Sequence, residues 1–176
     1  MPGFAYIIKG SNLTTILNTY YPDKELQRII IGILDDFEKD MKYRPFVDAI
    51  TFVQELKKCD IPTCIVTSSS MLKMENAFAQ LPGFREMFDG LITGDMVSRC
   101  KPDPEGYLMG AKMIGVKPEN CYVFEDSLQG MQAGINAGCK VIALTTTVER
   151  TRIESIKTDK IMDSFEDFDV KTMLEI

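Results

Sequence analysis

Two adjacent carboxylate residues, Glu125 and Asp126, follow directly after the apolar residues 121–124. An apolar run of this length between polar segments predicts a short buried strand. In parallel α/β sheets, ligands bind in the crevice beyond the carboxyl ends of the strands. Magnesium in proteins is held by one or two carboxylates together with waters and phosphate oxygens. The pair therefore predicts a magnesium site, and the alternative interpretation is a solvated acidic turn.

Two further polar clusters occupy comparable positions along the chain. Thr67 and Ser68 follow the apolar residues 61–66, and Lys101 precedes a helix that Pro104 is suited to open. A hydroxyl with neighbouring backbone N–H groups, an ammonium group and a cation-binding carboxylate pair are the parts that hold a phosphoryl group. Taken alone, Thr67 could cap a helix and Lys101 could be a solvated surface lysine. Their order on successive strand ends favours a phosphoryl-binding site.

The elements that position these groups alternate along the chain. Apolar residues at helical spacing predict helices over residues 23–37, 46–58, 71–80, 104–113 and 128–137. Short apolar runs predict strands over residues 61–66, 90–93, 121–124 and 140–145, and a short helix, an apolar step at 161–162 and an amphipathic segment follow. Strands that alternate with helices predict a parallel α/β sheet with right-handed crossovers. Residues 12–42 are helical only and are expected to pack as a separate lid.

Composition narrows the class of protein. With 176 residues and 45% hydrophobic content, the chain can form one domain with a core. A net charge of −6 without a basic block argues against a nucleic-acid partner, and we find no signal peptide or membrane segment. The five cysteines form no CxxC pair and are expected to be reduced residues of a cytoplasmic protein. The absence of histidine excludes His-based triads and His metal ligands within these residues.

Three short motifs together carry a resemblance to a known family. Residues 65–69 (Ile-Val-Thr-Ser-Ser), 101–104 (Lys-Pro-Asp-Pro) and 123–127 (Val-Phe-Glu-Asp-Ser), followed by Gly130 and Ala133-Gly134, resemble the haloacid dehalogenase-like hydrolases. The resemblance is closer to the branch of β-phosphoglucomutase and small-molecule phosphatases with a helical cap. It implies a three-layer, doubly wound parallel sheet with a Rossmann-like core. Residues 45–176 would form this core and residues 1–44 part of the α-helical cap.

The resemblance also implies a role for each candidate site residue. Thr67 would bind phosphoryl oxygens through its hydroxyl and Ser68 through its backbone. Lys101 would neutralise the phosphate and the nucleophile, and Asp126, with Glu125 beside it, would hold Mg²⁺. Lys9 and Gly10 are similar to the cap loop that reaches the substrate. The implied partner is a small phosphorylated metabolite.

One departure from the family pattern concerns the nucleophile. Members of the family open with a strand that ends in Asp-x-Asp, and this chain has no such motif ahead of its cap-like residues. Residues 4–8 followed by Lys9 could be a degenerate first strand, but Lys9-Gly10 matches the cap loop better. Asp35 and Asp36 end another apolar run, but its helical period places them in the lid. We therefore expect the chain to begin inside the cap, without the first strand and roughly the first cap helix.

The resemblance implies that the missing strand is central, between the strand that ends at Thr67 and the strand that ends at Glu125. Its loss would leave unpaired backbone groups that cost about 1–3 kcal/mol each if buried, against a total stability of about 5–15 kcal/mol. The slot could be completed by an upstream segment, by another part of the chain, or by a second chain, as in a homodimer. The first of these is the expected case.

The leading functional hypothesis is a Mg²⁺-dependent phosphatase or phosphomutase that is inactive without its aspartyl nucleophile. The alternative is a catalytically dead protein that binds phosphate or a partner. Phosphoglucomutases place an arginine in the cap loop where this chain has Leu13, and this difference favours a phosphatase over a sugar phosphomutase.

Overall fold

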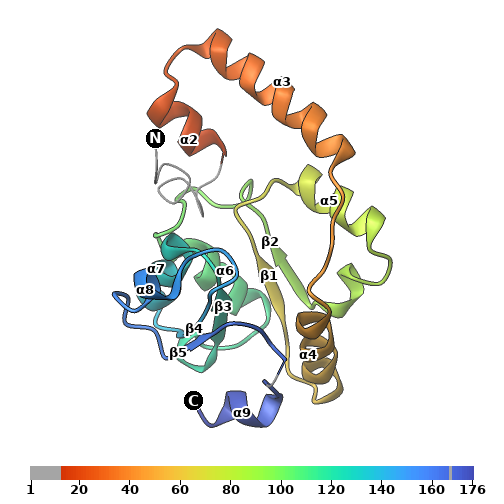
Figure 1. The fold of residues 1–176 in the computed structure, drawn as a ribbon, viewed down its shortest axis with the longest axis vertical. Helices are drawn as coiled ribbons and strands as arrows, with labels where there is room; N and C mark the ends of the chain where they lie inside the picture. The colour runs from red at the N-terminus through yellow and green to blue at the C-terminus, as the bar shows by residue number, and fades with distance from the viewer. Residues whose placement is uncertain (1–12, 167) are drawn as a thin grey trace.

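The computed structural model describes residues 13–166 and 168–176, and Figure 1 shows how their helices and strands are arranged. Two helices, α2 (Leu13–Tyr20) and α3 (Lys24–Asp40), stand apart from the five short strands and the other helices. We refer to these two helices as the lid. Within the described ranges, no helix combines the length and the apolar content needed to cross a membrane.

All strand pairs are parallel, and they form two sheets. β1 (Cys64–Val66) pairs with β2 (Gly90–Ile92) in one sheet. In the other sheet, β4 (Lys140–Leu144) lies between β3 (Tyr122–Glu125) and β5 (Lys160–Met162). Among the described residues, no strand joins β1 to β3. This gap lies where the sequence led us to expect a missing central strand.

Helices cover both faces of the sheets, as the alternation along β4 requires. Val141 and Ala143 pack in one apolar cluster with Tyr107 of α6 (Glu105–Met113) and Met131 of α7 (Leu128–Asn136). Ile142, which points to the other face, packs in a second cluster with Phe52 of α4 (Val47–Lys58) and Met173 of α9 (Val170–Leu174). The structure therefore confirms the predicted α/β fold with helices on both sides of parallel strands.

Side-chain caps fix where several helices begin. Ser70 Oγ accepts a hydrogen bond from Lys73 N at 3.2 Å at the start of α5 (Met71–Gln80), and Ser127 Oγ accepts one from Gly130 N at 3.0 Å at the start of α7. Asp23 caps α3 in the same way. The remaining short elements are α8 (Arg150–Ile153) and single 3-10 turns over Arg85–Met87 and Pro118–Asn120. Because Ser70 caps α5, the interpretation of Thr67 as a helix cap is wrong.

The predicted strand boundaries differ from those observed by a few residues. The strand expected from residue 61 begins at Cys64, because Pro62 has no N–H to donate to a neighbouring strand. The strand expected to end at Phe124 continues to Glu125, which pairs with Ala143 in β4. The predicted helix over residues 71–80 is confirmed at both ends. The strand boundaries matter because they place Glu125 inside the sheet and Asp126 beyond it.

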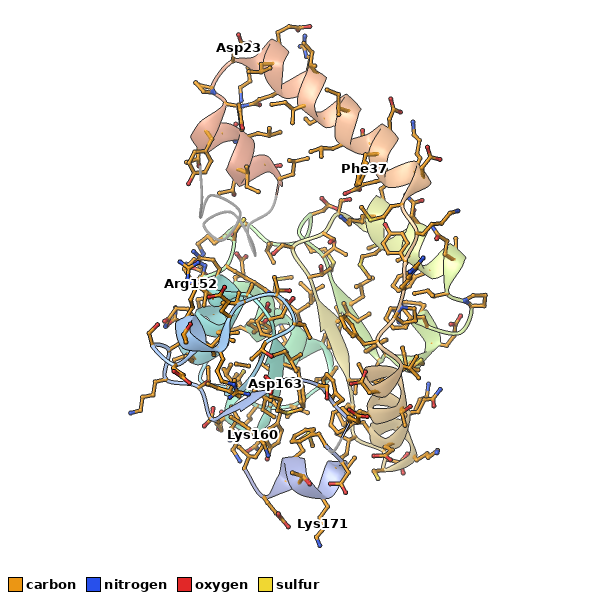
Figure 2. All side chains as sticks on the ribbon, viewed as in Figure 1. Asp23, Phe37, Arg152, Lys160, Asp163 and Lys171 are labelled. Atoms are coloured by element: carbon orange, nitrogen blue, oxygen red, sulfur yellow. The ribbon has the colours of Figure 1, made fainter. Side chains whose placement is uncertain are left out.

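Outside the lid, helix α3 contacts the protein near its C-terminal end. Figure 2 labels Asp23 at its N-terminal end and Phe37 near the other end. Its apolar residues Ile29, Ile33 and Phe37 are 53%, 64% and 64% exposed. Glu38 of α3 forms an ion pair with Lys73 of α5, with 2.9 Å between Oε1 and Nζ. This ion pair ties the lid to the helix that follows β1.

Candidate active site

The candidate site residues surround one cavity between the lid and the carboxyl ends of β1 and β3. The cavity has a volume of about 1010 Å³. Its lining includes Thr67, Ser68, Lys101, Glu125 and Asp126, which come from three separate parts of the chain. The structure thus brings together all the predicted site residues that it describes. The other two, Lys9 and Gly10, lie outside the described residues.

Lys101 is a partly buried group that links the two sheets. Its ammonium nitrogen lies 2.7 Å from Glu125 Oε2, and the two side chains are only 11% and 10% exposed. The same nitrogen donates to the carbonyl oxygen of Val66 at 3.4 Å and to Tyr107 Oη at 3.0 Å. Lys101 therefore reaches β1 and β3 at once, and its interpretation as a solvated surface lysine is wrong.

The Glu125 carboxylate accepts hydrogen bonds on both oxygens. Lys101 and the Tyr107 hydroxyl, at 2.5 Å, donate to Oε2. The backbone N–H and the hydroxyl of Ser127 donate to Oε1 at 3.1 and 2.7 Å. Gly130 makes room for this arrangement, because a Cβ atom at that position would lie 2.0 Å from Glu125 Cδ. Glu125 is thus directed inward and holds Lys101 in position.

Asp126 has a different environment from its neighbour. It lies one residue beyond β3 and lines the cavity, and the Thr147 hydroxyl donates a hydrogen bond to its Oδ2. Among the described residues, no group of three or more His, Cys, Asp or Glu side chains is placed to hold a metal ion. Mg²⁺ does not require such a group, because it takes one or two carboxylates and completes its shell with waters and phosphate oxygens. Asp126 fits that requirement.

The loop after β1 is held in a defined conformation beside Lys101. Thr67 N donates to the Ile92 carbonyl oxygen at 2.9 Å, and Thr67 Oγ1 accepts from Ser69 N at 3.1 Å. Gly94 N donates to the Ser69 carbonyl oxygen at 2.8 Å. Because Thr67 Oγ1 acts as acceptor in this turn, its hydroxyl hydrogen can be directed to a ligand oxygen. The loop can therefore present a preorganised donor to an anion in the cavity.

Three contributors to the site were not assigned a role from the sequence. Tyr107 and Ser127 position Glu125, and Thr147 positions Asp126. Thr147 comes soon after a predicted strand, so the strand-end rule that selected Thr67 could also have selected it. Tyr107 gave no comparable signal, because an aromatic residue inside an apolar helix is read as core.

The Tyr107 hydroxyl gives the site a defined response to high pH. Burial, and next the negative charge of Glu125, raise the pKa of Tyr107 well above its ordinary value of 10.0. The stability that the protonated phenol contributes is fully present at pH values below the ordinary pKa of 10.0. It is lost at higher pH, because the unfolded chain then releases a proton that the folded chain keeps.

Tyr107→Phe should therefore lower the free energy of unfolding by about 1.5–3 kcal/mol near neutral pH, because the hydroxyl donates to a charged acceptor. The difference between the two proteins should shrink as the pH rises from about 8 to about 11. Urea unfolding of both proteins across this range measures it. Both share every other titrating group, so a constant difference would contradict the assignment.

Known proteins resemble this chain in sequence. A family model for haloacid dehalogenase-like hydrolases matches residues 12–138. Hexitol phosphatase A of Escherichia coli is 37% identical over 124 residues, which are 69% of this chain and 55% of that protein. This chain spans between 16% and 55% of the length of four of the curated relatives it matches, hexitol phosphatase A among them.

Solved structures agree at the level of the fold. A hydrolase of this family from Entamoeba histolytica superposes with a TM-score of 0.83 at 23% identity, covering 99% of this chain and 82% of that one. CbbY from Rhodobacter sphaeroides, solved in complex with phosphate, gives a TM-score of 0.65 at 29% identity, covering 72% of this chain and 57% of that one. With a family model that covers most of its residues, the chain belongs to the haloacid dehalogenase-like hydrolases.

Proposed function

We propose that the chain forms the phosphate-binding part of a Mg²⁺-dependent phosphatase for small phosphate monoesters. The Thr67 hydroxyl, the backbone of Ser68 and the Lys101 ammonium group bind the phosphoryl oxygens. Asp126 holds Mg²⁺, which when bound supplies positive charge to the phosphate. Glu125, Tyr107 and Ser127 position Lys101 and keep its ammonium group between β1 and β3. Residues 1–44 form part of a cap, and residues 45–176 form the core. The lid helices belong to this cap and cover the substrate.

The charge of the cavity carries the proposal for a metal ion. Five carboxylates line it among the described residues, namely Asp35, Glu38, Asp95, Glu125 and Asp126, against two ammonium groups, Lys73 and Lys101. Both ammonium groups are already in ion pairs. A phosphate dianion would be repelled by this surplus of negative charge unless a divalent cation accompanied it. A carboxylate-bound Mg²⁺ meets this need.

Turnover depends on a nucleophile in the gap between β1 and β3. No described residue places a carboxylate on a strand in that gap. We therefore propose that this chain binds phosphate, and that it hydrolyses esters once a strand with an aspartate nucleophile occupies the gap. The same observation favours the second candidate function, a phosphate-binding protein without catalysis.

Calorimetric titration with inorganic phosphate, with and without Mg²⁺, tests the binding part of the proposal. Mg²⁺ should strengthen binding by about tenfold or more, and Asp126→Asn should remove that gain. Asp163→Asn is the matched control, because its exposed carboxylate pairs with Arg150 on the surface. Equal affinity with and without Mg²⁺ would contradict the metal site.

A hydrolysis assay with p-nitrophenyl phosphate separates the two candidate functions. The 176-residue chain should give no turnover, and the same chain extended by a strand that ends in Asp-x-Asp should give it. Turnover by the unextended chain would contradict the need for that strand. Inactivity of a folded, phosphate-binding extended chain would favour the non-catalytic candidate.

A further inference from the structure

The lid side of the cavity has an acidic lining. The lid contributes Leu13, Thr14, Ile16, Leu34, Asp35 and Glu38. The described lid residues in this lining include no lysine or arginine. The part of a substrate that extends from the phosphate towards the lid therefore meets carboxylate and hydroxyl oxygens beside apolar side chains.

The two lid carboxylates differ in how far their charge is compensated. Glu38 forms the 2.9 Å ion pair with Lys73, so its charge is largely neutralised. No hydrogen bond or ion pair from the described residues reaches the Asp35 side chain. Lys39 of the same helix pairs with Asp36 at 2.8 Å and interacts with Asp35 only through space. Among the described residues, Asp35 thus presents to the cavity a carboxylate that no ion pair neutralises.

We infer that Asp35 is a specificity-determining residue that selects monophosphates with a hydroxyl-rich organic group over substrates with a second phosphate. This inference rests on the proposed function. An ionised carboxylate can only accept hydrogen bonds, so it pairs with hydroxyl donors and offers nothing to a phosphate dianion. A second phosphate near Asp35 is also repelled, with an energy that depends on the local dielectric. Discrimination therefore comes from attraction of hydroxyl-rich monophosphates and repulsion of substrates with a second phosphate.

The test compares three probes with the full chain in the presence of Mg²⁺: inorganic phosphate, sorbitol 6-phosphate and fructose 1,6-bisphosphate. Calorimetry should show sorbitol 6-phosphate bound about tenfold more tightly than the bisphosphate. Asp35→Asn should reduce this ratio to about twofold and retain binding of inorganic phosphate. Asp36→Asn, one residue away on the exposed side of α3, should keep the ratio of the unmodified chain.

The possible results separate this inference from the function on which it rests. If the unmodified chain fails to bind inorganic phosphate, the proposed function and the inference both fall. If it binds phosphate but holds the bisphosphate as tightly as the monophosphate, only the inference is overturned. The same holds if Asp35→Asn leaves the ratio unchanged, or if it removes phosphate binding, which would assign Asp35 to the phosphate-holding residues.

Discussion

Replacing Lys101 with methionine is expected to lower the free energy of unfolding by about 3–5 kcal/mol and to weaken inorganic phosphate binding by at least about tenfold. The first effect follows from the burial of its partner. The Glu125 side chain is 10% exposed and would lose the only ammonium group paired with it among the described residues. The second effect follows because the methionine side chain offers no donor to a phosphoryl oxygen.

The double variant Lys101→Met with Glu125→Gln separates these two effects. A neutral amide at position 125 can accept from Ser127 through its oxygen and donate its NH2 group to the Tyr107 oxygen, and it leaves no unpaired charge. Most of the lost stability should return in urea unfolding, while phosphate binding stays weak in calorimetry. A single variant as stable as the unmodified chain would show that the ion pair does not form in solution.

Gly130→Ala is expected to destabilise the protein by about 3 kcal/mol, although alanine is the better helix former. The added Cβ would lie 2.0 Å from Glu125 Cδ and 2.2 Å from Oε2. Glu125 would have to move, and its bonds to Lys101, Tyr107 and Ser127 would break together. We therefore expect the free energy of unfolding and the phosphate affinity to fall in parallel.

Gly32→Ala is the matched control for this substitution. Gly32 is also inside a helix, α3, but a Cβ there would meet nothing within 4 Å. Without a steric cost, the higher helix propensity of alanine should raise the stability by about 1 kcal/mol. Opposite signs for the two substitutions in urea unfolding would support the close approach at Gly130. A neutral or stabilising Gly130→Ala would show that Glu125 can lie elsewhere.

The convergence of the site could be predicted from the sequence because it follows from topology. Thr67 and Asp126 come after different parallel strands, and such strands end at the same side of an α/β fold. The different directions of Glu125 and Asp126 could also have been derived. Residues along a strand alternate between its two faces, and Glu125 shares the face of Val123, which packs in the cluster that contains Tyr107.

Other features depend on contacts that no local pattern reports. The Tyr107 hydroxyl becomes part of the site only through the placement of α6 against β1. The apolar period of α3 predicted an amphipathic helix but not what covers its apolar side, and Ile33 and Phe37 are each 64% exposed. Helical periodicity fixes which residues share a face, whereas the presence of something to cover that face is a property of the whole assembly.

The position of Lys101 has a consequence for how firmly the two sheets are held together. Its ammonium group bridges the gap between the two sheets, because it donates to the carbonyl oxygen of Val66 in β1 and to the carboxylate of Glu125 in β3. An anion that binds in the cavity competes for this same ammonium group. Anion binding is therefore coupled to the strength of the contacts that Lys101 makes between the two sheets. Deuterium uptake by the backbone amides along β1 and β3 should consequently register ligand occupancy.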